Sequence, residues 1–244
     1  MNFEPADLRI SLIILGTLVF FYLYYYTAHS AVMERWIFKN TSGIAAELRL
    51  FLFRKLSGFV FLGMMPAMLY SSVAEISFDK FGFTFTHFIE NIFLIPGMIA
   101  LIAVLLFFRH RINPTLNTLQ IKTNRWTNTL MIFDVLGWSV YLLAYEFLFR
   151  GILLIECSNH FGFLPAIVIN IVLYSAIHMI NGKDQAIGSV FFGAVACYLT
   201  LQMGTILIPL FMHIALSGFS DYFSVRMNPS IHYAEYSPVK SGEQ

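Results

Sequence analysis

Residues 129–157 read TLMIFDVLGWSVYLLAYEFLFRGILLIEC, an apolar run that is long enough to cross a lipid bilayer. A spanning helix needs about 20 mostly apolar residues, and this run exceeds that length. Two ionisable side chains, Glu146 and Arg150, lie four residues apart within the run. The run therefore predicts a transmembrane helix that is tilted or broken and that carries charge inside the membrane.

The composition of the whole chain also predicts a membrane protein. Of its 244 residues, 58% are hydrophobic and 12% are charged, whereas soluble domains carry about 25% charged residues. Too little polar surface remains to face water on all sides, so the bilayer is the expected solvent. The net charge of +1 gives no field that would attract nucleic acid. Cys157 and Cys197 lie in apolar runs and are expected to be buried thiols.

Six further apolar segments raise the expected number of transmembrane helices to about seven, so we predict an all-α integral membrane protein. The first run, Ile10–Tyr26, is too long for the h-region of a signal peptide and is expected to be retained. Ala45 to Phe53 leaves room for an eighth, re-entrant or interfacial piece. The seven expected segments are 9–29, 56–74, 89–108, 129–157, 163–180, 185–203 and 205–225.

The positions of Lys and Arg predict the orientation, because cytoplasmic loops carry an excess of these residues. Seven spans with the N-terminus outside and the C-terminus in the cytoplasm place most of them on the cytoplasmic side: Arg35, Lys39, Arg49, Arg54, Lys55, Arg109, Arg111, Lys122, Arg125, Lys183, Arg226 and Lys240. The basic loop 109–128 separates residues 1–128, with three spans, from a C-terminal core at 129–227. Residues 228–244 are expected to be a flexible cytoplasmic tail.

Four ionisable residues inside the expected spans are candidates for a functional site, because charge within a bilayer is costly. Glu146 and Arg150 share a helix face and form either a structural ion pair or part of a site. His178 is either an interfacial histidine or a site residue. His213 either bridges two helices or belongs to the same site, and Ser217 lies one turn further on the same face.

The expected depths of these residues are compatible with one cavity. At 1.5 Å per residue, Glu146, His213 and His178 lie roughly 16, 12 and 22 Å from the outer ends of their helices. One carboxylate and two imidazoles around a water can perform hydrolysis, and the same three side chains can ligate a metal ion such as zinc. Asp134 is expected near the cytoplasmic end of its helix, where it caps or pairs locally.

Three motifs follow one another on separate expected helices: Tyr145-Glu146-x-x-x-Arg150, Tyr174-x-x-x-His178 and His213-x-x-x-Ser217. They resemble the E-E-x-x-x-R, F-x-x-x-H and H-x-x-x-N motifs of the CAAX protease and bacteriocin-processing family, whose type member is the type II CAAX prenyl endopeptidase. Phe149-Arg150-Gly151 and the lead-in Gly204–Pro209 extend the resemblance over roughly residues 130 to 220. Many bacterial members are intramembrane metalloproteases or abortive-infection proteins, so the resemblance implies a protein of the bacterial plasma membrane.

The resemblance also implies roles for the site residues. Glutamate and His178 would activate water, His213 would bind the oxyanion, and Arg150 would orient the glutamate. The sequence departs from the family at Tyr145, which replaces the first glutamate and leaves Glu146 about 100° further round the helix. Two further departures are Tyr174 for phenylalanine and Ser217 for asparagine.

Three functions are compatible with these residues. The leading hypothesis is an intramembrane endopeptidase that hydrolyses a peptide bond near the membrane in a membrane-associated or CAAX-like protein, with Glu146, His178 and His213 as catalytic residues. The alternative is a pseudoprotease that acts as a membrane scaffold or immunity factor. A transporter is disfavoured, since we find no matched half-repeats with broken helices.

Overall fold

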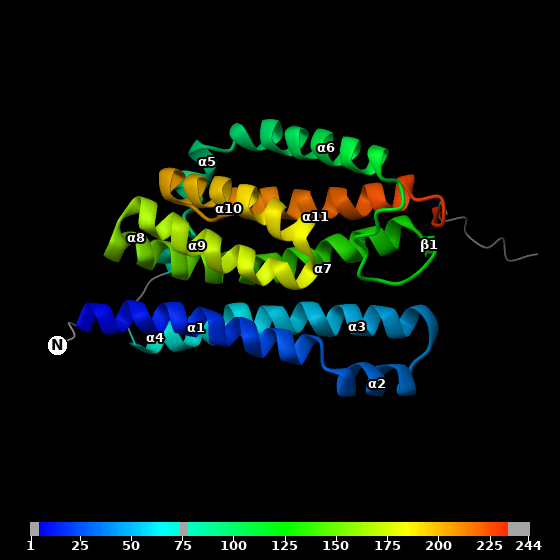
Figure 1. Cartoon of the computed structure of the whole chain (residues 1–244), viewed down its shortest axis with the longest axis horizontal. Coiled ribbons are helices and arrows are strands. Elements are labelled where there is room, and N and C mark those ends of the chain that lie inside the picture. Colours follow the sequence, from blue (N-terminus) through cyan, green and yellow to red (C-terminus); the bar gives the residue numbers. More distant parts are fainter. Residues whose placement is uncertain (1–4, 74–77, 234–244) are drawn as a thin grey trace, which may run out of the picture.

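The computed structural model describes residues 5–73 and 78–233, which form a bundle of helices (Figure 1). The helices are α1 (Pro5–Ala28), α2 (Ala31–Asn40), α3 (Gly43–Gly58), α4 (Met65–Val73), α5 (Phe85–Glu90), α6 (Leu94–Ile112), α7 (Asn128–Glu146), α8 (Ile155–Phe161), α9 (Phe163–His178), α10 (Lys183–Met203) and α11 (Leu207–Met227). The π-helical segments η1 (Phe59–Met64) and η3 (Phe147–Leu154) connect α3 to α4 and α7 to α8, and η2 (Phe78–Phe81) and η4 (Met179–Asn181) are 3₁₀ turns.

The structure confirms an all-α membrane protein. The described parts of all seven expected segments are helical over most of their length. By length and composition, four helices in the described part of the chain can cross a membrane: Ala6–Asn40, Gly43–Ser71, Leu94–Ile112 and Lys183–Met203. The number of seven spans and the orientation stay predictions.

The region between the first two expected spans is helical, not a loop. Ser30 caps α2 by accepting a hydrogen bond from the Met33 amide at 3.4 Å. The next helix begins at Gly43 and continues without a break through η1 into α4. Ala45 to Phe53 is therefore part of a long helix and not a separate re-entrant piece. The error arose because Lys and Arg mark loops only on average, whereas Lys55 of α3 is 2% exposed.

The helices lie in layers (Figure 1). The first layer holds α1, α3 and α4, the next holds α7, α8 and α9, and α10 and α11 lie beyond them. α6 packs against α11 on the far side, so the three N-terminal spans cover two opposite faces of the C-terminal core. Close approach of α3 and α7 depends on Gly137, where a Cβ would lie 2.3 Å from the Phe51 ring.

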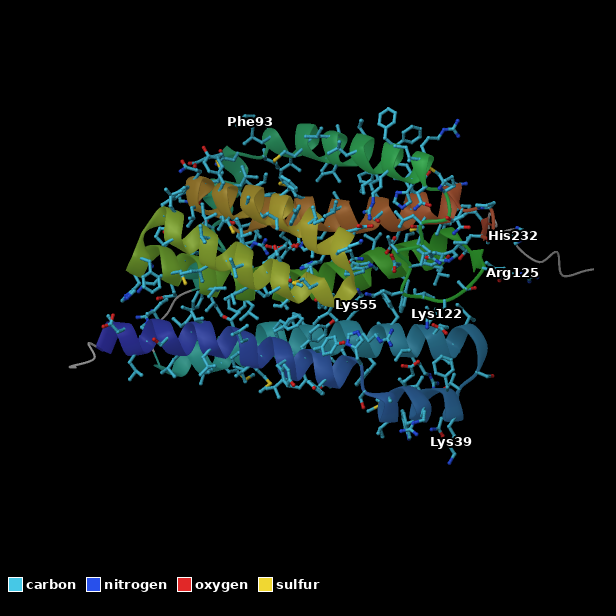
Figure 2. All side chains as sticks on the ribbon, viewed as in Figure 1. Lys39, Lys55, Phe93, Lys122, Arg125 and His232 are labelled. Carbon is cyan, nitrogen blue, oxygen red and sulfur yellow. The ribbon has the colours of Figure 1, made fainter. Side chains whose placement is uncertain are left out.

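The expected flexible tail begins with an ordered segment. Strand β2 (His232–Tyr233) pairs in parallel with β1 (Arg125–Trp126). Burial explains this order, because Trp126 is 0% exposed and Tyr233 packs against its cluster. Lys39, Lys122, Arg125 and His232 lie at the same end of the molecule (Figure 2). The remainder of the tail, 234–244, lies outside the described residues.

Candidate functional site

The site is built around the junction of α7 and η3. Glu146 is the last residue of α7, and Arg150 lies in the π-helical turn that follows. All eight residues of η3 are buried, so this segment faces other helices and not lipid. A π-helical turn changes the direction of the side chains that follow it, and such turns are frequent at functional sites. The long expected span is thus continuous but irregular at its centre.

Glu146 is engaged by two partners. Its Oε1 lies 2.6 Å from His213 Nδ1 on α11, and its Oε2 lies 3.3 Å from Arg150 Nε. The side chains of Glu146 and Arg150 are both 0% exposed. The carboxylate therefore neutralises a buried guanidinium and orients an imidazole, and both of its oxygens face protein groups.

Arg150 is held on its other side by an aromatic ring. Its guanidinium carbon lies 4.1 Å from the centroid of the Tyr174 ring on α9, in cation–π geometry. Gly193 on α10 leaves room for that ring, since a Cβ there would lie 3.2 Å from Tyr174 Cδ1. The motif residue Tyr174 thus packs on the guanidinium of the first motif.

The ring of Tyr145 contacts both imidazoles. Its ring centroid is 6.2 Å from that of His178 and 6.0 Å from that of His213, with both rings nearly perpendicular to it. The side chain is buried, and its hydroxyl has no hydrogen-bond partner among the described residues. The position of the family's first glutamate is therefore filled by a phenol.

His178 and Ser217 stand apart from the Glu146 carboxylate. His178 Nδ1 lies 2.8 Å from the Tyr174 carbonyl oxygen. A carbonyl can only accept, so Nδ1 must carry the proton and Nε2 keeps its lone pair. Within the described residues, Ser217 forms no hydrogen bond with His213 or Glu146. The structure thus joins Glu146, Arg150 and His213 directly, joins His178 to them through Tyr145, and leaves Ser217 outside.

Two residues that the motifs did not indicate support the site. Asn170 on α9 donates from Nδ2 to the Phe149 carbonyl at 2.6 Å, and Cys197 on α10 donates its thiol to Asn170 Oδ1 at 3.2 Å. Phe149 lies in the π-helical segment, so the amide binds the backbone at the irregular turn. A buried amide needs a hydrogen-bond partner, and this lone asparagine in an apolar span was the available signal.

These side chains do not fit a zinc site. A zinc ion in a catalytic site takes three protein ligands at about 2 Å. Among residues 5–73 and 78–233, no group of three or more His, Cys, Asp or Glu side chains is placed to hold a metal ion. Glu146 Oε1 and His213 Nδ1 bind each other, and the Tyr145 ring packs against both His178 and His213. The expected ligand set of Glu146, His178 and His213 is not assembled.

Comparison with known families agrees with the motifs. Residues 125–219 match the model of a family described as type II CAAX prenyl endopeptidase Rce1-like. This segment contains all of the motif residues described above, and it confirms the resemblance to the CAAX protease family. No curated protein and no solved structure matched the chain. The match to this family covers residues 125–219, which is less than half of the 244-residue chain.

Proposed function

We propose that this chain is a pseudoprotease, a membrane protein that uses a CAAX-protease domain to bind a membrane-associated polypeptide without cutting it. The observation that carries the proposal is that Tyr145, at the position of the first glutamate, packs its ring against the imidazoles of both His178 and His213. A phenol keeps its proton at neutral pH and is a poor general base, so the residue in this place does not activate water.

Glu146 does not replace the missing base in this arrangement. A general base needs a free lone pair within hydrogen-bonding reach of the water that it deprotonates. Oε1 of Glu146 accepts a hydrogen bond from His213 Nδ1 at 2.6 Å, and Oε2 faces Arg150 Nε at 3.3 Å in an ion pair. The side chain is 0% exposed, so neither oxygen is open to a water molecule. Its contacts support a structural role that keeps α7 and α11 together.

The partner we propose is a membrane-associated or lipidated polypeptide end, and the role is that of a scaffold or immunity factor in the bacterial plasma membrane. The family match supports this class of partner, because the family is named for the processing of prenylated CAAX sequences. A domain that keeps the fold while losing the base retains the means to bind such a chain without hydrolysing it.

One observation favours a second candidate, the intramembrane endopeptidase. His178 Nε2 keeps its lone pair because Nδ1 donates to the Tyr174 carbonyl, and the ring is only half-buried. In this reaction His178 takes a proton from water, and the hydroxide oxygen bonds to the scissile carbonyl carbon. His213, held by Glu146, donates to the resulting oxyanion. Collapse of the intermediate breaks the C–N bond, and His178 returns the proton to the amine.

Proteoliposomes that contain the full chain and a quenched fluorescent farnesylated CAAX peptide distinguish the two candidates. We expect saturable binding of the peptide, measured by fluorescence anisotropy, and no cleavage above that of empty liposomes. Tyr145→Glu is expected to introduce cleavage, whereas the matched control Tyr145→Phe keeps the ring and is expected to leave the peptide intact.

Two results would contradict the pseudoprotease. Cleavage by the wild-type chain that is lost in His178→Ala establishes the endopeptidase instead. Absence of both binding and cleavage removes the proposed partner class, because a family domain that recognises lipidated ends should at least retain this peptide.

A further inference from the structure

A second group of buried polar side chains lies outside the candidate site, where α3, α7 and α11 meet. Lys55 and Asp221 are each 2% exposed and Asp134 is 0% exposed. Lys55 lies in the middle of the molecule, on the side of α3 that faces α7 (Figure 2). Asp134, which was expected to cap or pair locally, instead lies near Asp221 and Lys55. This position corrects the expectation, since Asp134 faces inward from the first half of α7.

The carboxylates of Asp221 and Asp134 differ in the hydrogen bonds that they accept. Asp221 Oδ1 accepts a hydrogen bond from the Thr118 hydroxyl at 2.5 Å, and its Oδ2 accepts one from the Trp138 indole at 2.9 Å. Both oxygens of Asp134 are buried and accept no hydrogen bond from a donor among the described residues, and the Asp134 carboxyl group lies within hydrogen-bonding reach of that of Asp221. A buried carboxylate without a partner is one of the most costly groups in a folded protein. The Asp134 carboxylate therefore indicates that a ligand binds at this place.

Lys55 compensates only one of the two negative charges. Its Nζ lies 2.8 Å from the centroid of the Trp138 ring, and within the described residues it forms no ion pair with Asp134 or Asp221. The cluster of two carboxylates and one ammonium thus has a formal charge of −1. Arg54, the next cation on α3, lies 3.5 Å from Glu34 and is already paired.

The other titratable groups packed around the cluster are two tyrosines and one histidine, and all three side chains have a neutral form. The Tyr141 ring of α7 faces Lys55 at 5.0 Å, and Tyr24 of α1 lies behind it at 5.4 Å. On the side of α6, His110 contacts the Ser224 hydroxyl at 3.2 Å, and Ser224 contacts Thr118 at 2.9 Å. His110 therefore reaches Asp221 only through two hydroxyls.

We propose that Asp134 and Asp221, with the Thr118 hydroxyl, form a buried site for one monovalent cation, either H⁺ or Na⁺. One positive charge brings the cluster to neutrality, and the available ligand atoms are carboxylate and hydroxyl oxygens. Both cations bind to oxygen: H⁺ bonds to one carboxylate oxygen and can be shared with the facing carboxylate, whereas Na⁺ is held by several oxygen ligands. A divalent ion would leave the cluster positive beside Lys55. Since α7 and α11 also carry Tyr145, Glu146 and His213, occupancy of this site would stabilise the helix pair that supports the candidate site.

The test measures the thermal unfolding midpoint of the full chain in lipid nanodiscs. For Na⁺, the midpoint rises with NaCl and saturates, and choline chloride at the same ionic strength has no effect. For H⁺, the midpoint is indifferent to the choice of salt and falls as pH rises, because the folded chain holds one more proton than the unfolded chain. Infrared spectra then show the C=O band of a protonated carboxyl group.

Asp134→Asn assigns the response to this site, since it removes the charge and keeps the shape. It is expected to abolish the Na⁺ response, or to remove the carboxyl band and reduce the pH response. The matched control is Asp184→Asn at the exposed start of α10, which is expected to retain both. The proposal is overturned if the wild-type chain responds to neither Na⁺ nor pH, or if Asp134→Asn responds like the wild type. If the variant does not fold, the wild-type chain still overturns the proposal when it responds to neither Na⁺ nor pH and shows no C=O band of a protonated carboxyl group.

Discussion

Replacing Glu146 by glutamine tests whether this residue is structural or catalytic. The substitution keeps the shape of the side chain and removes its charge. Arg150, which is 0% exposed, then keeps the Tyr174 ring at 4.1 Å but has no carboxylate partner among the described residues. Breaking a buried ion pair from one side costs about 3–5 kcal/mol, because an uncompensated charge remains inside the protein. We therefore expect Glu146→Gln to lower the free energy of unfolding by about that amount.

The chain provides a matched control on the same helical run. Glu156 of α8 also pairs with an arginine, Arg9, at 2.7 Å, but the two side chains are 17% and 50% exposed. A solvent-exposed pair contributes about 0–1 kcal/mol, so Glu156→Gln should have a small effect. The assay is equilibrium or thermal unfolding in lipid nanodiscs, in which 1 kcal/mol shifts the midpoint by roughly 2–4 °C for a chain of this size.

A double variant separates the charge from the packing. Arg150→Met in the Glu146→Gln background removes the stranded cation, and uncharged side chains of similar volume are often tolerated in place of a buried pair. We expect the double variant to recover a large part of the lost stability. The structural reasoning is refuted if Glu146→Gln is no more destabilising than Glu156→Gln. That result would mean that the Glu146 carboxylate is hydrated, as a base that activates water must be.

Two further predictions concern the packing around the site. Asn170→Leu should lower the free energy of unfolding by about 1–3 kcal/mol, because the Phe149 carbonyl and the Cys197 thiol lose their partner; Asn117→Leu in the exposed loop is the control, and equal effects would contradict the role of the amide. Gly137→Ala should cost about 1–3 kcal/mol by forcing α3 away from α7, since its Cβ would lie 2.3 Å from the Phe51 ring. Gly188→Ala, with no described atom within 4 Å of the added Cβ, should be tolerated, and a Gly137→Ala chain as stable as this control would disprove the close approach.

The sequence predicted the helices well where apolar composition alone identifies them. The long run at 129–157 is helical throughout, as its apolar length requires. The region 30–55 was wrongly predicted as a loop, because its basic residues lower the hydropathy without preventing helix formation. The burial of Lys55 depends on Trp138, which is more than 80 residues away in the chain, so no local pattern could reveal it.

The candidate site was predictable as a set of residues but not as a set of contacts. Helical spacing placed Glu146 and Arg150 on one face, and Glu146 Oε2 lies 3.3 Å from Arg150 Nε. Spacing could not show that His213 would donate to the other carboxylate oxygen, or that the Tyr145 ring would contact both imidazoles. Those contacts depend on the relative rotation of α7, α9 and α11, which the π-helical turn at η3 alters in a way that a regular helical wheel does not represent.

The retained and the altered motif residues differ in what the fold requires of them. Glu146, Arg150 and His213 form one connected set, in which the carboxylate pairs with the guanidinium and accepts a hydrogen bond from the imidazole, so loss of Glu146 leaves an uncompensated cation inside the protein. The Tyr145 hydroxyl has no hydrogen-bond partner among the described residues, and the ring packs against the Phe149 ring. A phenol can be buried in this way without adding charge, whereas a second carboxylate would bring another negative charge beside Glu146. Folding therefore constrains the second glutamate of the motif strongly and the first only weakly. A chain that does not need to hydrolyse peptides, as proposed here, can lose the first glutamate but must keep the second, which is the pattern at positions 145 and 146.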